Sequence, residues 1–219
     1  MNITNKTVLI TGANRGVGLA LVNEALRRGA KRVYAGARGA LPHSDKRVTH
    51  LTLDVTNALQ IKQAAGEVDT LDVLINNAGI AIYDDLSNFE VIGQHMAVNF
   101  FGMLNVTRAL LPLLKRSKGA IVNNLSMVAL APLPIIPAYS ISKAAAFSMT
   151  QSLRAHLAGQ GVTAGRLLTN QQSWNIVNHL SITRNRLIPQ SSKLVREVIR
   201  ADLDAAQQGD TPNWQPFGN

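Results

Sequence analysis

Tyr139 and Lys143 are the two side chains in this sequence whose types and spacing could carry proton transfer. Four residues apart on a helix, they share one face and lie one above the other. A phenol ionises near pH 10, so acid–base work at neutral pH requires its pKa to fall by roughly 3 units, about 4 kcal/mol. An ammonium about 4 Å away supplies an interaction of roughly that size at an effective dielectric constant near 20. Because Tyr and Lys share this spacing in many helices, the pair alone could also be coincidental.

A glycine-rich turn near the N-terminus is the second chemical signal. Residues 6–10 are apolar and β-branched and predict a buried strand, whereas residues 19–28 show a helical pattern. Between them, Gly12 permits a tight turn, and Gly16 and Gly18 let a pyrophosphate approach the N-terminus of the helix. The alternative is an ordinary strand-to-helix connection in which the glycines serve only the geometry.

Four motifs together resemble the short-chain dehydrogenase/reductase family, in the family's order and at its intervals. They are Thr11-Gly-x-x-x-Gly-x-Gly18, Asn76-Asn-Ala-Gly79, Ser126 and Tyr139-x-x-x-Lys143. The resemblance covers residues 6–164 and implies a single-domain, Rossmann-like α/β fold, a doubly wound parallel sheet with helices on both faces. Residues 1–164 are then the dinucleotide-binding and catalytic core, and residues 165–219 are a divergent C-terminal segment of the same domain.

The resemblance implies reversible hydride transfer between NADP(H) and a carbonyl/secondary alcohol pair, as in carbonyl reductases. Tyr139 would exchange the hydroxyl proton, and Lys143 would depress the Tyr139 pKa and bind the nicotinamide ribose. Ser126 would orient the carbonyl, although the family often has two serines where this chain has Ser126-Met127. Asn99 would hold a water that continues the proton relay; the alternative is an interior Asn satisfied by backbone groups.

Several segments would bind the cofactor by the same resemblance. Asp54 and Val55 follow a predicted strand at residues 48–53 and are assigned to the adenine pocket, but Asp54 could instead cap the next helix. Asn76 could have a purely structural role. The predicted cofactor-binding residues are Thr11, Gly12, Asn14, Arg15, Gly16, Val17, Gly18, Arg38, Asp54, Val55, Asn77, Ala78, Gly79, Tyr139 and Lys143.

Two arginines favour NADP over NAD. A predicted strand at residues 32–37 ends at Ala37-Arg38, where NAD-preferring sequences place an acidic residue that binds the ribose 2′-hydroxyl. Arg15 lies inside the glycine-rich turn. Two guanidinium groups without a carboxylate suit a 2′-phosphate, which they can bind through charge-assisted hydrogen bonds. The alternative is that both arginines are simply exposed.

The composition limits the classes of protein to consider. A chain of 219 residues, 46% hydrophobic and 16% charged, fits one domain with an ample core. It has no cysteine, which excludes disulfides and thiol chemistry. No apolar run approaches the ~20 residues of a membrane span, and the first residues lack a signal-peptide core, so a cytoplasmic protein without a membrane partner is expected. No metal site is predicted, because the histidines show no metal-ligand spacing and are expected to be superficial or incidental: His43, His50, His95, His156 and His179.

The net charge of +9 is concentrated near the N-terminus, where residues 1–50 hold nine basic and two acidic residues. Nucleic-acid binding would explain a basic surface, but aromatic residues are sparse and the basic ones surround a nucleotide-sized site. Steering of a phosphate-rich cofactor explains the charge as well. The predicted partners are therefore a small-molecule carbonyl or alcohol and no nucleic acid. In many relatives the helix at residues 89–115 and the Tyr139 helix form a subunit contact, so a homodimer or homotetramer is expected.

The C-terminal quarter departs from the family pattern. Residues 161–168 begin like a sixth strand, but the expected Pro-Gly turn and nicotinamide-binding Thr do not follow. Residues 169–190 are polar without a clear period, and residues 191–208 recover a helical pattern. This departure supports an alternative function, a catalytically impaired NADP-binding protein that acts as a sensor or partner subunit. A second alternative is a sugar-nucleotide epimerase, which shares Tyr-x-x-x-Lys. This alternative is not favoured, because such an enzyme usually needs a longer C-terminal domain.

Overall fold

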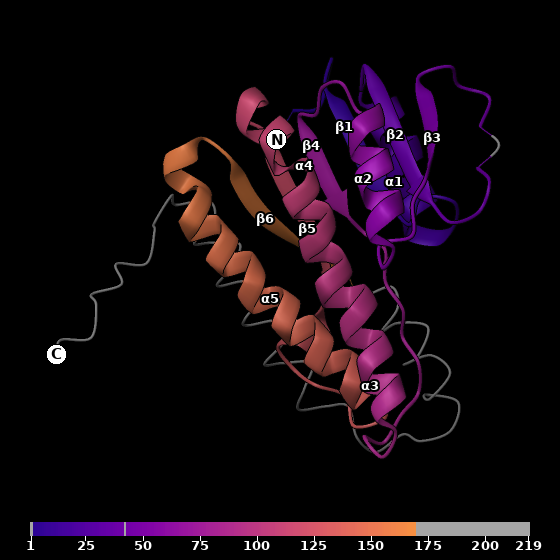
Figure 1. Ribbon diagram of the computed structural model, residues 1–219, viewed down its shortest axis with the longest axis vertical. Coiled ribbons are helices and arrows are strands. Elements are labelled where there is room, and N and C mark those ends of the chain that lie inside the picture. Colours follow the sequence, from indigo (N-terminus) through magenta and orange to yellow (C-terminus); the bar gives the residue numbers. More distant parts are fainter. Residues whose placement is uncertain (1, 42, 170–219) are drawn as a thin grey trace, which may run out of the picture. The chain divides into compact units, whose positions relative to one another are not determined.

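Six parallel strands form one sheet in the part of the chain that the structure describes (Figure 1). This computed structural model describes residues 2–41 and 43–169. The strand order is β3-β2-β1-β4-β5-β6. Strands β2 and β3 are added on one side of β1, and β4 to β6 on the other, so the strand order reverses between β1 and β4. The doubly wound topology predicted from the sequence is confirmed. The strands are β1 Thr7–Thr11, β2 Arg32–Ala37, β3 Val48–Thr52, β4 Val73–Asn76, β5 Ala120–Ser126 and β6 Thr163–Thr169.

Helices cover both faces of this sheet, again as predicted (Figure 1). Successive side chains of a strand point to opposite faces, and β1 shows the consequence. Val8 and Ile10 pack in a core cluster with α1, whereas Leu9 belongs to a larger cluster with α2, α4 and α5. The helices are α1 Gly16–Arg27, α2 Ala58–Glu67, α3 Phe89–His95, α4 Met103–Ser117 and α5 Pro137–Leu157.

Most predicted elements lie where the sequence pattern places them. β2 has the predicted bounds, and β6 pairs in parallel with β5, which confirms the sixth strand. α1 begins at Gly16, three residues before the predicted start, because the end of the glycine-rich turn already forms its first turn. The predictions for residues 170–208, a polar stretch followed by a helix, lie outside the described residues.

The helix predicted at residues 89–115 contains a wider turn that the sequence pattern does not reveal. α3 leads into a π-helical segment, Met96–Gly102, and α4 follows. Asn99 and Gly102 are buried in this segment, and a Cβ on Gly102 would lie only 2.7 Å from Cγ2 of Val55. Short π-helical turns inside α-helices are frequent at functional sites. This one turns Asn99 toward the interior.

The same helical run, Phe89–Ser117, is long and apolar enough to cross a membrane by length and composition alone. In the folded chain, 44% of its most apolar window is buried inside the protein. Val106, Leu110 and Leu114 of α4 belong to the core cluster on the sheet. The apolar face of this run therefore serves to cover the sheet.

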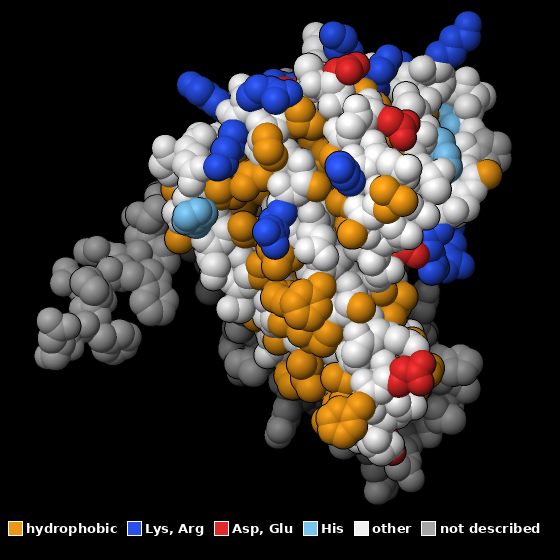
Figure 2. Space-filling model, in the orientation of Figure 1, with side chains coloured by type: hydrophobic (Ala, Val, Ile, Leu, Met, Phe, Trp, Pro, Cys, Tyr) orange, Lys and Arg blue, Asp and Glu red, His pale blue; other side chains and the backbone are white. Residues whose placement is uncertain are grey.

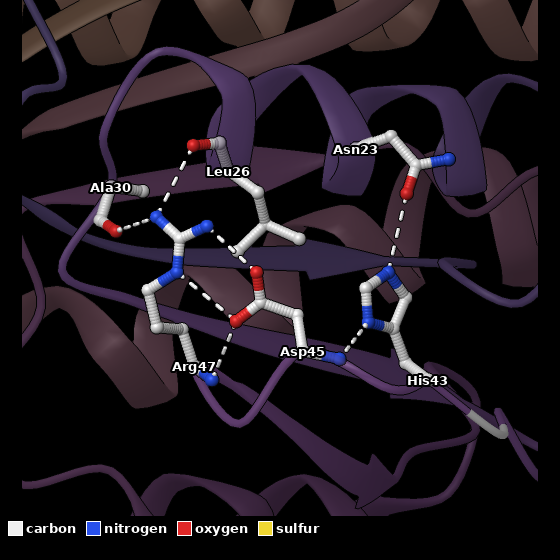
Figure 3. A network of polar contacts seen from close by, with 6 residues as sticks. All are labelled: Asn23, Leu26, Ala30, His43, Asp45 and Arg47. Atoms are coloured by element: carbon white, nitrogen blue, oxygen red, sulfur yellow. Dashed lines mark hydrogen bonds and ion pairs between the residues drawn. The ribbon is translucent and has the colours of Figure 1, made fainter.

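A polar network fastens the loop before β3 to the end of α1 (Figure 3). Nη1 of Arg47 donates hydrogen bonds to the carbonyl oxygens of Leu26 and Ala30, each at 3.2 Å. The same guanidinium binds Asp45 through two hydrogen bonds, of 3.0 and 2.7 Å. A helix end leaves its last carbonyl groups without intrahelical partners. The Arg47 side chain supplies partners at this end of α1 and holds the loop that returns from β2.

Asp45→Asn should destabilise the fold at neutral pH but not in strong acid. Hydrogen bonds from the Arg47 side chain and backbone lower the pKa of Asp45 from 3.8 to about 2. The ionised carboxylate therefore stabilises the folded state above pH 3.8, and this contribution is lost as the pH falls toward 2. Urea unfolding of both proteins between neutral pH and this acid interval measures the difference. A difference in midpoint that does not shrink in acid would contradict the assignment.

Candidate active site

The glycine-rich turn forms a cradle between β1 and the start of α1. Gly12 and Gly16 have positive φ angles of 63° and 54°, which glycine adopts without steric cost. A Cβ on Gly18 would lie 2.0 Å from the carbonyl oxygen of Gly12, so only glycine lets the helix start this close to the turn. The N-cap residue, Arg15, makes no side-chain cap hydrogen bond. The partial positive charge at this helix N-terminus favours an anionic group in the cradle.

The cradle opens into a cavity of about 610 Å³ at the carboxyl ends of the strands. Open α/β sheets bind their ligands at this edge, where the strand order reverses. All the residues predicted to bind the cofactor line this cavity except Thr11 and Tyr139. The lining also includes seven residues that the sequence analysis did not select: Ala37, Gly39, Leu53, Ile80, Val98, Asn124 and Leu125. One cavity with glycines at a helix N-terminus fits an extended dinucleotide.

Thr11 shapes this cavity from inside the protein. Its hydroxyl accepts hydrogen bonds from the backbone N–H groups of Asn77, at 2.9 Å, and Ala78, at 3.0 Å. The Asn77 side chain donates to the carbonyl oxygen of Thr11 at 2.9 Å and accepts a hydrogen bond from Asn124 at 2.9 Å. Thr11 is 1% exposed. It therefore holds together the segments that line the cavity instead of lining it.

Asn76 has the structural role that the sequence analysis left open. Its Nδ2 donates to Thr107 Oγ1 and to Asn123 Oδ1, each at 2.9 Å. Asn123 donates in turn to Thr150 Oγ1 at 2.8 Å. These buried contacts join β4, β5, α4 and α5, and Asn76 is not among the cavity-lining residues.

The charged residues of the cavity are mainly basic. Arg15 and Arg38 are exposed and line it, and Asp54 is the one acidic residue in the described lining. Burial opposes ionisation of Asp54, but hydrogen bonds from Thr56 and the charge of Arg38 outweigh it and lower the Asp54 pKa. α2 is capped by Asn57, whose side chain accepts two backbone N–H groups of the first turn. The alternative of Asp54 as the helix cap is therefore wrong.

The four predicted catalytic residues converge beside the cavity. Ser126 ends β5, Tyr139 and Lys143 lie one turn apart on α5, and Asn99 lies on the π-helical segment. All four are between 0% and 4% exposed. The Ser126 side chain is hydrogen-bonded to Tyr139. Lys143 Nζ lies 5.6 Å from the centre of the Tyr139 ring and donates a hydrogen bond to the carbonyl oxygen of Asn124 at 3.0 Å.

The polar atoms of the Asn99 side chain are hydrogen-bonded to neighbouring groups. This agrees with the alternative given for this residue, an interior Asn satisfied by backbone groups. Its Oδ1 accepts the backbone N–H of Ile80, and its Nδ2 donates to the carbonyl oxygen of the same residue, both at 2.9 Å. Nδ2 also donates to Ser142 Oγ at 2.9 Å. The Ser142 hydroxyl donates to the backbone oxygen of Tyr139 at 2.7 Å. Asn99 thus fastens the π-helical segment to the first turns of α5.

Burial sets the protonation of the acid–base pair. It raises the pKa of Tyr139 to about 12, and the hydrogen bond with Ser126 opposes this rise only in part. Burial also lowers the pKa of Lys143 to about 8. The predicted depression of the Tyr139 pKa is therefore wrong for the protein alone, because loss of hydration raises the pKa by more than the hydrogen bond with Ser126 lowers it. At neutral pH the Tyr139 phenol keeps its proton.

Three residues that the sequence patterns did not reveal support this site. His95, expected to be superficial or incidental, is 0% exposed, and its ring centre lies 6.1 Å from that of Tyr139. The expected surface position was wrong because a single His in a helical pattern gives no sign of which face it occupies. Ser140 accepts the backbone N–H of Leu133 at 3.2 Å and ties the preceding loop to α5. Ser140 and Ser142 lie between Tyr139 and Lys143 in the sequence. Their small hydroxyl side chains, so close to the acid–base pair, were recognisable from the sequence as candidate supports of the site.

Comparison with known proteins agrees with this geometry. The family model described as short chain dehydrogenase matches residues 6–170. Estradiol 17-beta-dehydrogenase 2 of Rattus norvegicus is 35% identical over 210 residues, which cover 82% of this chain and 55% of the relative. The chain spans about half the length of the curated relatives it matches.

Solved structures show the same fold. A short chain dehydrogenase from Burkholderia cenocepacia J2315 in complex with NADP has a TM-score of 0.74 and 40% identity, over 77% of this chain and 73% of that chain. An NADPH bound carbonyl reductase from chicken fatty liver has a TM-score of 0.70 and 27% identity, over 76% of each chain. The family match includes the glycine cradle, the cavity and all four converging side chains. The chain belongs to the short-chain dehydrogenase family.

Proposed function

We propose that this protein transfers a hydride between NADP(H) and an apolar carbonyl compound or secondary alcohol. The observation that carries the proposal is the convergence of Ser126, Tyr139 and Lys143 beside a cavity that begins in a glycine cradle and that Lys143 lines. Arg15 and Arg38 line the same cavity and suit a 2′-phosphate. The relatives named for NADP, NADPH, a carbonyl reductase and an estradiol dehydrogenase support the same cofactor and substrate class.

The protein's own groups supply the proton. When bound, the dinucleotide supplies the hydride for reduction or accepts it in oxidation. In reduction, the Tyr139 phenol donates its proton to the carbonyl oxygen, and the Ser126 hydroxyl donates a hydrogen bond to the same oxygen. Lys143, with a pKa of about 8, is mostly protonated at neutral pH and stabilises the phenolate that forms on Tyr139.

Tyr139 holds the proton that reduction requires. Burial raises the pKa of Tyr139 to about 12, so the phenol of the protein alone is protonated at neutral pH. Reduction requires the protonated phenol, which is the form present. The apolar residues Ile80, Val98 and Leu125, which line the cavity alongside polar groups, support an apolar substrate. Met127 and Val128, just after Ser126, are buried apolar residues.

Removing both arginines should weaken NADPH binding by about 10- to 100-fold, because a hydrogen bond to a charged group contributes roughly 1.5–3 kcal/mol. Fluorescence titration of the wild type and of Arg15→Ala/Arg38→Ala with NADPH and NADH measures this. NADH affinity should change little, since that cofactor lacks the 2′-phosphate. Arg116→Ala, which changes an exposed arginine at the end of α4, is the matched control. Equal affinities of the wild type for the two cofactors would contradict the NADP assignment.

A measurement of turnover distinguishes an active oxidoreductase from the alternative function, a catalytically impaired NADP-binding protein. We expect NADPH absorbance to fall when the protein is mixed with phenanthrenequinone, an apolar dicarbonyl used as the probe substrate. Tight NADPH binding without turnover of this probe or of a panel of apolar ketones would instead favour the non-catalytic, NADP-binding protein.

The face formed by α4 and α5 supports the further proposal of a homodimer or homotetramer. Figure 2 shows hydrophobic side chains gathered over this part of the surface. Phe101, on the π-helical segment, is 50% exposed, and Ile141 on α5 is 48% exposed. Contiguous exposed apolar patches commonly mark protein contacts. Light scattering should give a mass of two or four chains of 23.6 kDa; the mass of a single chain would contradict this proposal.

A further inference from the structure

The segment that follows β4 is tied to its surroundings at alternate residues. Ile80 exchanges hydrogen bonds of 2.9 Å with both ends of the Asn99 amide. Two residues later, Ile82 donates its backbone N–H to Nε2 of His95 at 3.0 Å. Residues 77–85 form neither helix nor strand, so these contacts hold a segment that has no ladder of its own. These bonds hold the segment against the π-helical turn and the end of α3, on the side where Tyr139 lies.

Asp84 joins the end of this segment to the helix that carries the acid. Its carboxylate oxygens accept the backbone N–H of Ala138 at 3.2 and 3.3 Å. Its own N–H donates to the carbonyl oxygen of Ile135 at 3.4 Å. Ala138 lies in the first turn of α5, where N–H groups have no intrahelical partner. Since Ala138 directly precedes Tyr139, Asp84 fixes the backbone from which the phenol projects.

His95 is held as one neutral tautomer. It is fully buried, and its Nε2 accepts a hydrogen bond from Ile82, so this nitrogen carries no proton. Nδ1 therefore carries the proton and donates it to the carbonyl oxygen of Val91 at 2.8 Å. Both ring nitrogens are occupied, and each bond requires this tautomer. His95 is thus a fixed group between α3 and the segment after β4.

The ring of His95 also borders Tyr139. The two ring centres are 6.1 Å apart and the planes are inclined by 60°, a favourable arrangement for an aromatic pair. Lys143 Nζ lies 5.6 Å from the same Tyr139 ring centre. The phenol therefore has His95 and Lys143 beside its ring and Ser126 at its hydroxyl. A change at His95 alters one of these supports without touching the hydroxyl.

We propose that His95 is a positioning residue for the proton transfer by Tyr139. By accepting the Ile82 N–H and packing beside the phenol ring, it holds Tyr139 in the orientation that delivers the proton to the carbonyl oxygen. The proposal rests on the proposed function, because it concerns the same reaction. His95 does not touch the reacting atoms; it acts through Tyr139 and through the segment after β4.

Two substitutions separate the hydrogen bond from the presence of a polar side chain. His95→Gln places an amide oxygen near the position of Nε2 and keeps an acceptor for Ile82, whereas His95→Asn is too short to reach it. We expect kcat for phenanthrenequinone to fall about 10- to 100-fold in His95→Asn, the effect of misplacing a reacting group. His95→Gln should recover most of this loss, and the Kd for NADPH should stay unchanged in both. His156→Asn, on the exposed end of α5, is the control.

Nitrogen-15 NMR tests the contact without turnover. The imidazole shifts should show the Nδ1–H tautomer, and the Ile82 amide should be protected from hydrogen exchange in the wild type and His95→Gln but not in His95→Asn. An Nε2–H tautomer, or an equal loss of kcat in the two variants, would overturn the proposal. Wild-type turnover with an unchanged kcat in His95→Asn would overturn the positioning role alone. Absence of wild-type turnover would overturn the proposed function and the positioning role together.

Discussion

Replacing Tyr139 with Phe should lower kcat for carbonyl reduction by about 10²- to 10⁴-fold, the usual contribution of a positioned general acid. The change removes one oxygen atom, the group that would donate the proton. The ring stays in place between His95 and Lys143, so the Kd for NADPH should change less than about twofold, well under 1.4 kcal/mol. Single-turnover decay of NADPH absorbance with phenanthrenequinone measures the rate, and fluorescence titration measures the Kd.

Tyr34→Phe is the matched control for this experiment. Tyr34 is also buried, but its hydroxyl accepts a hydrogen bond from Arg32 at the start of β2, away from the carboxyl end of the strand that borders the cavity. Loss of this hydroxyl should leave kcat unchanged. A Tyr139→Phe protein that retains the wild-type rate would show that another group supplies the proton.

Gly18→Ala should abolish NADPH binding and destabilise the fold. The added Cβ would lie 2.0 Å from the carbonyl oxygen of Gly12 and 2.7 Å from Nδ2 of Asn77. Neither contact can be relieved without moving the backbone of the cradle or the residues that line the cavity. Overpacking of this kind typically costs about 1–3 kcal/mol. Urea unfolding should show the lower stability, and fluorescence titration should show no saturation at NADPH concentrations that saturate the wild type.

Gly66→Ala provides a control with the same chemical change. Gly66 lies in α2, and a Cβ there would have nothing within 4 Å. Alanine in a helix is more favourable than glycine by up to about 1 kcal/mol, so this variant should be slightly more stable than the wild type. Its NADPH affinity should match the wild type. If Gly18→Ala behaved like Gly66→Ala, the close approach of α1 to the turn would not be required for binding.

Local patterns predicted the strands and the glycine cradle, and the family resemblance implied how they form the sheet and its cofactor edge. A strand such as β2 is a run of buried residues bounded by turns, and the cradle needs glycine wherever φ is positive or a Cβ would meet backbone. The positive φ angles and the approach of Gly18 to Gly12 involve near neighbours in the chain, so they can be recognised from the sequence. Tyr139 and Lys143 were recognisable for the same reason, since the period of one helix places them together.

Contacts between distant segments decided the rest. The turn at Asn99 and the burial of His95 each depend on which segments pack together, and a helical period does not contain that information. The Tyr139 pKa is the clearest case. The spacing to Lys143 favours a lowered value, but the pKa rises to about 12 because the surrounding elements exclude water from the phenol. Desolvation is a property of the packed interior, so only the tertiary structure could set its size.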